Sequence, residues 1–367
     1  MNRMHGIIFA YGRCAELQTL VEQRVADSIP YASRYRIVDF MLSNMVNAGV
    51  TDVGVILQDK YQSMLDHLGS GKDWDLSRKH GGLRLLPSVP KINPGRAFRG
   101  KMEALASVES YVQRIRQEYV VLANGALICN MPLGDVLEDH IRSGADITCV
   151  CTPKRVTATA TTYAVDEDGT ITDVISRSNV SGGYDALEVY IVSKKLLLEL
   201  IAECDGHNEY SFHSAVLQGM KGKLKLHAYV FEGYAARIMS AVDYYRRSME
   251  LLNADVRADL FNAERPIRTK DRSDASTYYG PESKCVNSLV SDGCIIEGEV
   301  ENSIVFRGVH VEKGAKISGC ILMQDTVIHS GATLKFAIAD KNVVVNQDRM
   351  LMGHSNYPLC ISKFSVV

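Results

Sequence analysis

Short apolar runs alternate with amphipathic stretches along residues 1–250 of this 367-residue chain. The apolar runs predict buried strands at residues 5–10, 52–57, 118–123, 146–151 and 187–192. The stretches between them repeat apolar residues at helical spacing and predict helices at residues 39–48, 62–68, 101–116 and 133–142. Strands that alternate with helices are typical of βαβ units, so we expect an α/β domain built on a parallel sheet.

Three further segments alternate apolar and polar residues and predict antiparallel strands at residues 163–166, 170–176 and 224–231. Asp168 and Gly169 form the expected hairpin turn between the first two. The first domain, residues 1–250, should therefore hold a mixed, mostly parallel sheet. Residues 264–281 are rich in turn formers, and we expect a linker over residues 251–283.

The periodicity changes after residue 283. A glycine followed three residues later by an aliphatic residue recurs at Gly293 and Ile296, Gly308 and Val311, Gly314 and Ile317, and Gly331 and Leu334. Aliphatic residues also recur six apart, as at Val311 and Ile317. A six-residue repeat with one inward aliphatic side chain per short strand predicts a parallel β-helix over residues 284–367. An irregular β-sandwich with chance glycines is the alternative.

Charge and cysteine content narrow the class of protein. The 41 basic and 43 acidic residues give a net charge of −2, so no general field attracts nucleic acid or an acidic membrane. The nine cysteines form no CxxC pair, which argues against a disulfide framework and against structural zinc. No apolar run is long enough to span a membrane, and no signal-peptide pattern precedes the first strand. We expect a cytoplasmic protein.

The first strand leads into a turn at residues 11–17 and then toward a helix. Such strand–turn–helix units hold phosphates when glycines let backbone N–H groups approach the anion. Here only Gly12 remains, flanked by bulky Tyr11 and by Cys14, and Glu16 adds a negative charge. The turn is therefore either a phosphate-binding turn that has lost its function or an ordinary βα turn.

The run Tyr35–Asn44 and the following residues 47–50 resemble the signature of the ADP-glucose pyrophosphorylases, the glucose-1-phosphate adenylyltransferases of bacterial glycogen synthesis. Members of that family carry a Gly-Gly-x-Gly-x-Arg-Leu turn where this chain has residues 11–17. The loss of two glycines and the arginine resembles the GlgD-type subunit, which accompanies a catalytic GlgC-type subunit. The similarity spans nearly the whole chain. It implies a nucleotidyltransferase-like domain followed by a left-handed parallel β-helix.

The resemblance places the family's two metal-binding aspartates at Gly125 and Arg237, so both carboxylates are absent. A guanidinium about 4 Å from a divalent ion would cost about 8 kcal/mol at an effective dielectric constant of 20. We therefore expect no metal in this chain, with Mg²⁺ held by the catalytic partner. A solvated Arg237 that points outward is the alternative.

Other contacts of the family are altered too. The family's Glu-Lys pair, whose lysine holds the sugar phosphate, corresponds to Ser176 and Arg177, and a second lysine corresponds to Ser214. Lys101 stands where the nucleotide base would pack. Arg177 could still hold a phosphate, although an arginine at a strand edge is more often solvated.

Arg24 and Arg36 match two arginines of the family's effector region. Two arginines can hold a phosphate bidentately, so a phosphorylated sugar is a candidate effector. Solvated charges or ion-pair partners are the alternative for both.

The resemblance implies a non-catalytic or weakly active regulatory subunit in a hetero-tetramer with a GlgC-type partner. An active enzyme that makes ADP-glucose and pyrophosphate is the alternative; Asp39, Asp135 and Glu188 are the acidic residues nearest the altered motifs. A hexapeptide-type acyltransferase would need a catalytic histidine such as His310 or His329.

Overall fold

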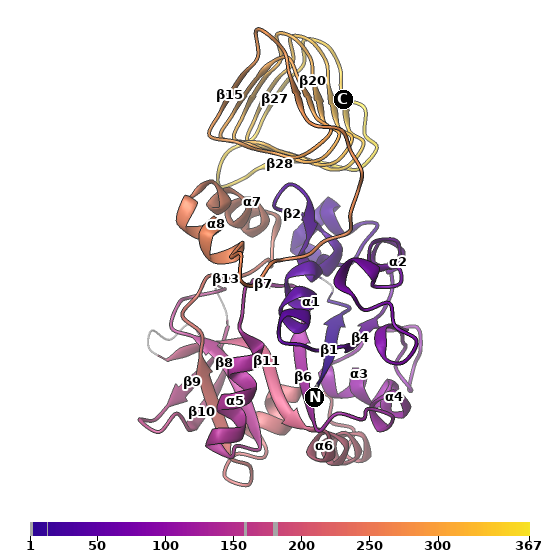
Figure 1. Cartoon of the computed structure of the whole chain (residues 1–367), viewed down its shortest axis with the longest axis vertical. Coiled ribbons are helices and arrows are strands. Elements are labelled where there is room, and N and C mark those ends of the chain that lie inside the picture. The colour runs from indigo at the N-terminus through magenta and orange to yellow at the C-terminus, as the bar shows by residue number, and fades with distance from the viewer. Residues whose placement is uncertain (1–2, 13, 158–159, 179–182) are drawn as a thin grey trace. The chain divides into compact units, whose positions relative to one another are not determined.

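A computed structural model describes residues 3–12, 14–157, 160–178 and 183–367. The chain forms two compact units (Figure 1). The sheet unit comprises Met1–Gly12, Phe40–Arg237 and Asn262–Ile267, and the solenoid unit comprises Arg13–Asp39, Ile238–Phe261 and Arg268–Val367. We describe each unit by itself. The predicted linker at residues 251–283 stays a prediction.

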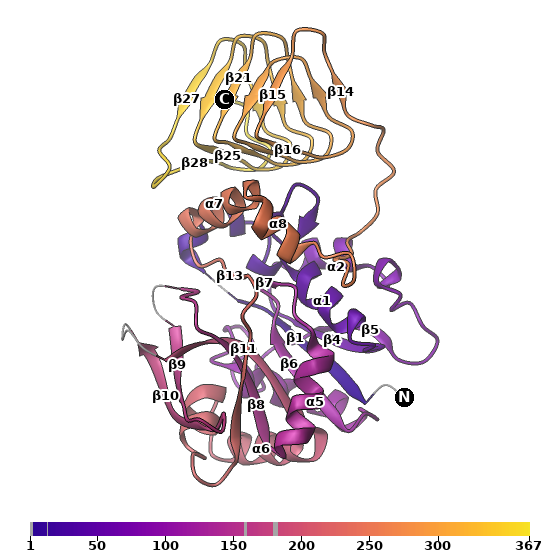
Figure 2. The same cartoon turned by 60° about the vertical axis from the view of Figure 1, so that its left-hand side comes forward.

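The sheet unit is built on a nine-stranded sheet (Figure 2). Seven strands follow the order β10 (Ile171–Ser178), β9 (Ala160–Val165), β11 (Tyr184–Ser193), β6 (Tyr119–Asn124), β1 (Met4–Ala10), β4 (Asp52–Leu57) and β5 (Gly82–Pro87). β8 (Ile147–Thr152) pairs with β11, and β12 (Leu226–Val230) pairs with β8. The strands from β6 through β1 and β4 to β5 are parallel, whereas β11 runs antiparallel to β6. The predicted mixed, mostly parallel sheet is confirmed.

The hairpin prediction is confirmed in part. β9 and β10 are antiparallel, and their turn is held by the carboxylate of Asp166, which accepts from the N–H groups of Asp168 (3.1 Å) and Thr170 (2.7 Å). Gly169 takes φ +79°, a conformation that favours glycine. The antiparallel prediction for residues 224–231 is wrong for the main pairing, because β12 pairs parallel with β8, although His227 forms an isolated antiparallel bridge with Thr170. Alternation alone shows that one face is buried, and it carries no information about strand direction.

Helices flank the sheet. They are α1 (Ile37–Asn47), α2 (Gln62–Leu68), η3 (Lys72–Trp74), α3 (Lys101–Ser107), α4 (Glu109–Gln113), α5 (Leu133–Ser143), α6 (Lys194–Gly206) and the π-helix η4 (Phe212–Gln218). The helix predicted over residues 101–116 breaks at Val108, which has non-helical dihedrals. Just before the break, the hydroxyl of Ser107 donates to the carbonyl of Ala104 at 2.6 Å, a bond that bends helices. A small antiparallel pair, β7 (Leu127–Cys129) and β13 (Ala235–Arg237), completes this unit.

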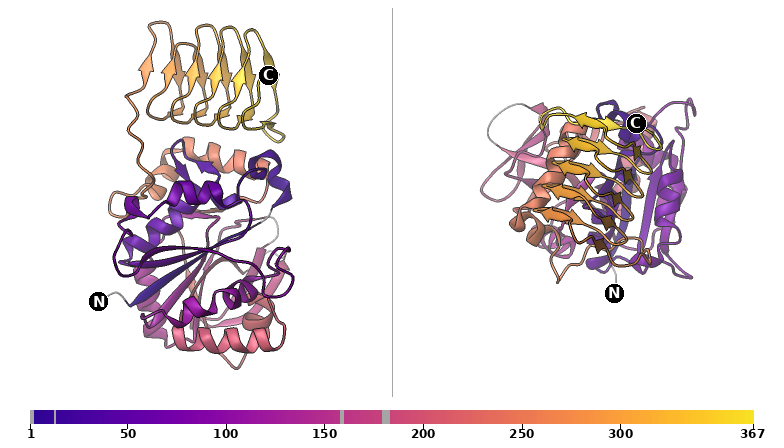
Figure 3. Two further views of the ribbon diagram at one scale, coloured as in Figure 1. Left: turned by 90° about the vertical axis from the view of Figure 1, so that its right-hand side faces the viewer. Right: turned by 90° about the horizontal axis from the view of Figure 1, so that it is seen from above.

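The solenoid is a left-handed parallel β-helix of three five-stranded sheets, and this prediction is confirmed (Figure 3). The first sheet stacks β14 (Tyr278–Tyr279), β17 (Ile295–Ile296), β20 (His310–Val311), β23 (Val327–Ile328) and β26 (Val344–Val345). The second stacks β15 (Lys284–Val286), β18 (Glu299–Glu301), β21 (Lys316–Ser318), β24 (Thr333–Lys335) and β27 (Met350–Met352). The third stacks β16 (Leu289–Val290), β19 (Ile304–Val305), β22 (Ile321–Leu322), β25 (Ala337–Ala339) and β28 (Leu359–Ile361).

The solenoid core follows from the aliphatic repeat. Stacked partners such as Ile296, Val311, Ile328 and Val345 are fully buried and lie 15 or 17 residues apart along the chain. A coil of three six-residue faces would need 18 residues. The observed spacing of 15 or 17 residues is shorter, so the corners of each coil are shorter than the six-residue repeat predicts. Each inward side chain contacts the equivalent side chain of the next coil, which is how a solenoid builds a continuous core.

The solenoid unit also contains β2 (Pro30–Tyr31), β3 (Tyr35–Arg36) and helices η1 (Ala15–Val21), η2 (Ala26–Ser28), α7 (Ala241–Met249), η5 (Glu250–Leu252) and α8 (Ala254–Leu260). Helix α7 joins these parts, because the hydroxyl of Tyr244 donates to the carbonyl of Pro30 and that of Tyr245 to the carbonyl of Gly319, each at 2.7 Å. Among the described residues, no helix is long and apolar enough to cross a membrane.

Candidate functional site

A pocket of about 310 Å³ opens at the carboxyl ends of the parallel strands β1 and β6. Open α/β sheets bind ligands at this edge. Three aromatic rings form one wall, since the ring of Tyr11 lies 5.1 Å from that of Phe98 and 6.1 Å from that of Phe9 between centroids. The lining residues are Phe9, Tyr11, Gly12, Phe98, Arg99, Gly100, Lys101, Asn124, Glu188, Ser211, Phe212 and His213.

Three charged side chains meet at this pocket, and we call Lys101, Glu188 and Arg237 the ion triad. Nζ of Lys101 pairs with Oε2 of Glu188, and Nη1 of Arg237 lies 2.8 Å from Oε1. Nδ2 of Asn124 also donates to Oε2, at 3.1 Å. The three charged side chains are only 13% to 16% exposed. Both oxygens of the carboxylate are thus engaged by cations.

A bulge in β11 aims Glu188 at the two cations. The register of β11 against β8 shifts between Ala186 and Tyr190, and Glu188 lies inside this shift with φ +57°. A bulge re-aims a side chain, and a left-handed non-glycine residue persists only where its surroundings hold it. The ion pairs with Lys101, at the start of α3, and Arg237, at the end of β13, provide that hold.

The pocket sets the protonation of its ionisable groups. Burial by itself raises the pKa of Glu188, but Arg237 and Lys101 outweigh burial and hold that pKa well below its usual range. Burial, and then the charge of Lys101, lower the pKa of His213 to about 4. Nε2 of His213 lies 3.0 Å from the hydroxyl of Tyr190. At neutral pH the imidazole is uncharged and the triad carries a net charge of +1.

The residues present do not fit a divalent cation. Gly125 has no side chain to offer, and its N–H donates to the carbonyl of Phe9 at 3.0 Å. Arg237 points inward onto Glu188, which excludes the outward, solvated alternative. A cation that approached Glu188 would meet two positive side chains, at a cost of several kcal/mol each. The described residues contain no group of three His, Cys, Asp or Glu side chains that could hold a metal ion.

The turn after β1 divides between the two units. Tyr11 packs against Phe98 in the pocket wall, and Gly12 is exposed. Cys14 and Glu16 belong to the solenoid unit, where the thiol of Cys14 donates to the carbonyl of Met239 at 2.6 Å and burial raises the pKa of the thiol. Glu16 is exposed in η1. That these two residues hinder phosphate binding stays a prediction.

The positions that correspond to the family's sugar-phosphate contacts lie on β10 and η4. Ser176 is exposed on β10; Arg177 lies on the same strand, and its side chain is outside the described part of the structure. Ser214 is exposed on the π-helix η4, a helix type that often marks functional positions. β10 and η4 are adjacent, because Nε2 of Gln218 donates to the carbonyl of Val174 at 2.6 Å.

The candidate effector arginines lie in the solenoid unit, and Arg24 is an ion-pair partner. Its Nη2 donates to both carboxylate oxygens of Asp340, at 2.6 and 2.8 Å, and both residues are buried. Nη1 of Arg24 is buried without a hydrogen-bond partner. Arg36 lies on β3, and its backbone N–H donates to Oδ2 of Asp39 at 2.9 Å.

A lysine that the sequence did not single out joins these arginines. Burial, and then the charges of Arg36 and Arg24, lower the pKa of Lys341 to about 7, while Asp340 opposes them and Lys363 adds to them. We call Arg24, Arg36, Lys341 and Lys363 the basic cluster. Lys341 lies two residues after the end of β25, a position that the periodicity assigns to an ordinary corner, so no sequence signal marked it.

The remaining candidates for catalysis do not gather at the pocket. Asp135 lies in the first turn of α5 and Asp39 in the solenoid unit, so Glu188 alone of the three acidic candidates lines the pocket. His310 and His329, considered for acyl transfer, pair with Glu297 at 3.4 Å and Glu312 at 2.9 Å. These partly exposed pairs are ordinary for the surface of a solenoid.

Known proteins resemble the chain over most of its length. Residues 5–175 match the family model for nucleotidyl transferases, and residues 275–356 match the model for the GlmU-like, C-terminal hexapeptide. The chain is 36% identical over 364 residues to the glycogen biosynthesis protein GlgD of Bacillus subtilis (strain 168), covering 99% of this chain and 96% of that protein.

Two further relatives carry the same two kinds of name. The glycogen biosynthesis protein GlgD of Geobacillus stearothermophilus is 37% identical, covering 86% of this chain and 83% of its own. A glucose-1-phosphate adenylyltransferase of Clostridium perfringens (strain SM101 / Type A) is 30% identical, covering 88% of this chain and 84% of its own.

Proposed function

The chain belongs to the ADP-glucose pyrophosphorylase family as a GlgD-type member, and from this premise we propose that it is a non-catalytic or weakly active regulatory subunit of glucose-1-phosphate adenylyltransferase in bacterial glycogen biosynthesis. Its role is to modulate a GlgC-type catalytic subunit, which supplies Mg²⁺ and performs the chemistry. We expect the two chains to form a hetero-tetramer in the cytoplasm.

The ion triad is the observation that carries this proposal. Nucleotidyl transfer develops negative charge on phosphate oxygens, and the family stabilises that charge with a metal held by carboxylates. Here both carboxylates are replaced, and two side-chain cations saturate Glu188. The lysine and the arginine occupy both oxygens of Glu188 and leave the triad with a net positive charge. A pocket so arranged lacks the main source of transition-state stabilisation.

An assay of the purified chain with Mg²⁺, ATP and glucose 1-phosphate tests the proposal. We expect negligible pyrophosphate release from the chain alone. When it is mixed with a GlgC-type subunit, we expect a higher turnover or a changed effector response, with a coupling of about 1 to 3 kcal/mol, or roughly 5- to 150-fold in affinity. Size-exclusion chromatography should show a mixed oligomer in the same samples.

Turnover of the isolated chain at the rate of an ordinary family enzyme would overturn the proposal in favour of the catalytic alternative. Complex formation that leaves the partner's kinetics unchanged would reduce the role of the chain to a structural one. The GlgC-type subunit at the same total concentration, without this chain, is the matched control.

The basic cluster is the proposed effector site for a phosphorylated sugar. Arg24 pairs with Asp340, and the charges of Arg24 and Arg36 both act on Lys341, so positive charge is concentrated at this place. The lowered pKa of Lys341 reflects positive charges held close together in a partly buried place. A dianionic phosphate would relieve that repulsion, which favours binding.

Replacing Arg36 by alanine should weaken effector binding by about 1.5 to 3 kcal/mol, the range for a hydrogen bond to a charged group. Isothermal titration with a phosphorylated sugar such as fructose 1,6-bisphosphate measures the change. Arg34→Ala removes an exposed positive charge from the turn just before β3 and is the matched control. Equal affinity in Arg36→Ala and in the parent would point to a structural role for the arginine.

Binding at the basic cluster should also depend on pH. Since the pKa of free Lys341 is about 7 and a bound anion raises it, affinity should increase as pH falls from 8 to 6. Lys341→Met should flatten this dependence apart from the titration of the ligand itself. The charged groups that act on Lys341 are Arg36, Arg24, Asp340 and Lys363.

A further inference from the structure

A second groove, of about 390 Å³, lies at the edge of the sheet opposite the ion triad. Strand β6 joins the two sites, because Tyr119 begins it at this groove and Asn124 ends it at the triad. At about 3.3 Å per residue the sites are roughly 16 Å apart. The volume is within the range of about 300 to 1,000 Å³ for ligand sites. The lining residues are Tyr119, His140, Ile141, Gly144, Ala145, Asp146, Ser193, Lys195, Leu196 and Glu199.

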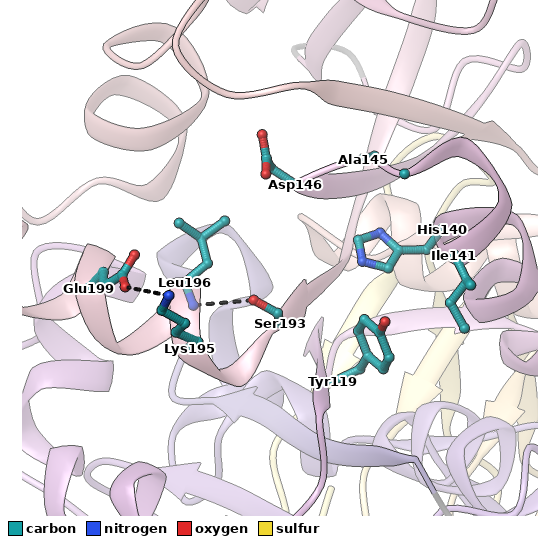
Figure 4. A pocket seen from close by; sticks show the side chains of 10 residues that line it. Tyr119, His140, Ile141, Ala145, Asp146, Ser193, Lys195, Leu196 and Glu199 are labelled. Atoms are coloured by element: carbon teal, nitrogen blue, oxygen red, sulfur yellow. Dashed lines mark hydrogen bonds and ion pairs between the residues drawn. The ribbon is translucent and has the colours of Figure 1, made fainter.

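Polar side chains from separate elements face this groove (Figure 4). His140, near the end of α5, packs edge-on against Tyr119 with 5.3 Å between ring centroids. Lys195 and Glu199 come from the first turns of α6 and form a pair at 4.0 Å. Asp146, in the loop before β8, lines the rim of the groove, and its Oδ2 accepts from the backbone N–H of Lys225 at 2.7 Å. The groove is therefore assembled by parts of the chain far apart in sequence.

His140 is a buried polar side chain directed at this groove. The residue is 3% exposed, and Nδ1 of its ring lies 2.8 Å from the hydroxyl of Thr148. Within the described ranges of the chain, Nε2 has no partner. Burial, and then the charge of His227, lower the pKa of the ring, so Nε2 is uncharged at neutral pH. A neutral imidazole nitrogen can donate or accept according to its tautomer.

The charges of the lining disfavour an anion. Asp146 and Glu199 contribute two negative charges and Lys195 one positive charge, which leaves a net charge of −1 when His140 is neutral. A phosphate would be repelled in spite of the α6 N-terminus, since a helix end contributes about half a positive charge. Among the residues described, no triplet of His, Cys, Asp or Glu is grouped to bind a metal.

A neutral polyhydroxyl compound fits this mixed polar lining. We propose that this groove binds an oligosaccharide, and, on the strength of the proposed function, that its ligand is an outer chain of an α-glucan such as glycogen. Each sugar hydroxyl both donates and accepts a hydrogen bond, which matches a lining that mixes carboxylates, an ammonium and an imidazole. Site and ligand are separate from the pyrophosphorylase pocket.

Different side chains of the groove make different contacts with the sugar. The carboxylate of Glu199 accepts from sugar hydroxyls, and the ammonium of Lys195 donates to them. The side chains of Leu196 and Ile141 contact the C–H faces of the sugar rings. One groove on an exposed surface binds weakly, and a glycogen particle, which presents many chain ends, raises the apparent affinity through multivalency. The groove would hold the subunit, with its partner, on the polymer that uses their product.

Binding of maltoheptaose to the full-length protein tests this inference. Titration calorimetry with maltoheptaose and affinity electrophoresis in gels that contain glycogen give the affinity. The double variant Lys195→Ala with Glu199→Ala should bind at least about fivefold more weakly, because it removes two polar groups from an exposed helix face without disturbing the core. Ala145→Trp should fill the groove and weaken binding by a similar factor.

The control variant is Lys313→Ala with Glu282→Ala, which removes an equally charged, exposed pair from the solenoid and should bind as the parent does. The inference is overturned if the parent does not bind maltoheptaose, if the groove variants bind as tightly as the parent, or if pyrophosphate binds there instead. Stimulation of a GlgC-type partner is measured in parallel. Lost stimulation with intact maltoheptaose binding contradicts the proposed function alone, and the reverse result contradicts this inference alone.

Discussion

Replacing Glu188 by glutamine is expected to lower the free energy of unfolding by about 3 kcal/mol. Removing one partner of a poorly exposed ion pair leaves an uncompensated charge, which costs about 3 to 5 kcal/mol, and the 13% to 16% exposure of the triad favours the lower end. The ammonium of Lys101 and the guanidinium of Arg237 would then repel each other without a carboxylate between them. Urea unfolding measures the change as a shift in midpoint at constant slope.

Lys101→Met is the matched control for this prediction. It leaves Glu188 paired with Arg237 at 2.8 Å, so the triad becomes a neutral pair and the cost should stay near 1 kcal/mol. The double variant should be more stable than Glu188→Gln alone, because only one cation remains. Equal losses in Glu188→Gln and Lys101→Met would mean that repulsion between the cations contributes little.

The pH dependence of the Glu188→Gln effect has a defined sign. The pKa of Glu188 in the folded protein is below its unfolded value of about 4.3, so the carboxylate stabilises the protein fully above that value. This stabilisation is lost as pH falls through the lower, folded pKa. The parent and the variant should therefore differ by the same amount from pH 7 down to about 5 and converge in stronger acid.

The sequence predicts that the two metal-binding aspartates of the family are replaced. It does not predict the ion pairs of Glu188 with Lys101 and Arg237. The loss of carboxylates at Gly125 and Arg237 is visible because the family resemblance extends over nearly the whole chain and fixes the positions that correspond to the two aspartates. The sequence marks Lys101 and Glu188 separately, but it does not show that they pair. They are 87 residues apart, and a period-two pattern does not reveal the bulge that gives Glu188 its φ of +57°. Side-chain pairing across a sheet depends on register, which one sequence does not define.

The solenoid shows the same division. Its aliphatic repeat predicted the fold, because a continuous core requires an inward side chain at every short strand. The sequence did not mark Asp340 as a functional residue, although its carboxylate pairs with the guanidinium of Arg24, 316 residues away in the chain. A buried aspartate that follows a strand looks like any corner residue in the sequence. Long-range ion pairs are fixed by the packing of coils on helices, and that packing has no periodic signature.

The largest change in activity is expected from rebuilding the active site in stages. Gly125→Asp with Arg237→Asp supplies two carboxylates, but Lys101 would still pair with Glu188 and place a positive charge beside the new ligands. We therefore expect Mg²⁺ binding to be weak in the double variant and to improve when Lys101→Thr is added. Mn²⁺ binding followed by electron paramagnetic resonance measures this step separately from catalysis.

Recovery of metal binding in these variants should not by itself restore catalytic turnover. The turn still lacks the groups that position and neutralise the triphosphate: Tyr11 packs in the pocket wall against Phe98. Each missing transition-state contact costs about 10²- to 10³-fold, so pyrophosphate release by the triple variant should stay at least about 10³-fold below that of a GlgC-type subunit. We expect measurable turnover only when Tyr11→Gly, Cys14→Gly and Glu16→Arg are added.

Gly125→Asn with Arg237→Asn is the matched control for the metal step, because it has the same size and hydrogen-bonding shape without the negative charge. This variant should bind no more Mn²⁺ than the parent. Gly125→Asp with Arg237→Asp alone could reach the rate of a catalytic subunit. That result would mean that neither the turn nor Lys101 prevents catalysis in this pocket. The loss of two carboxylates would then account for the inactivity of the chain by itself.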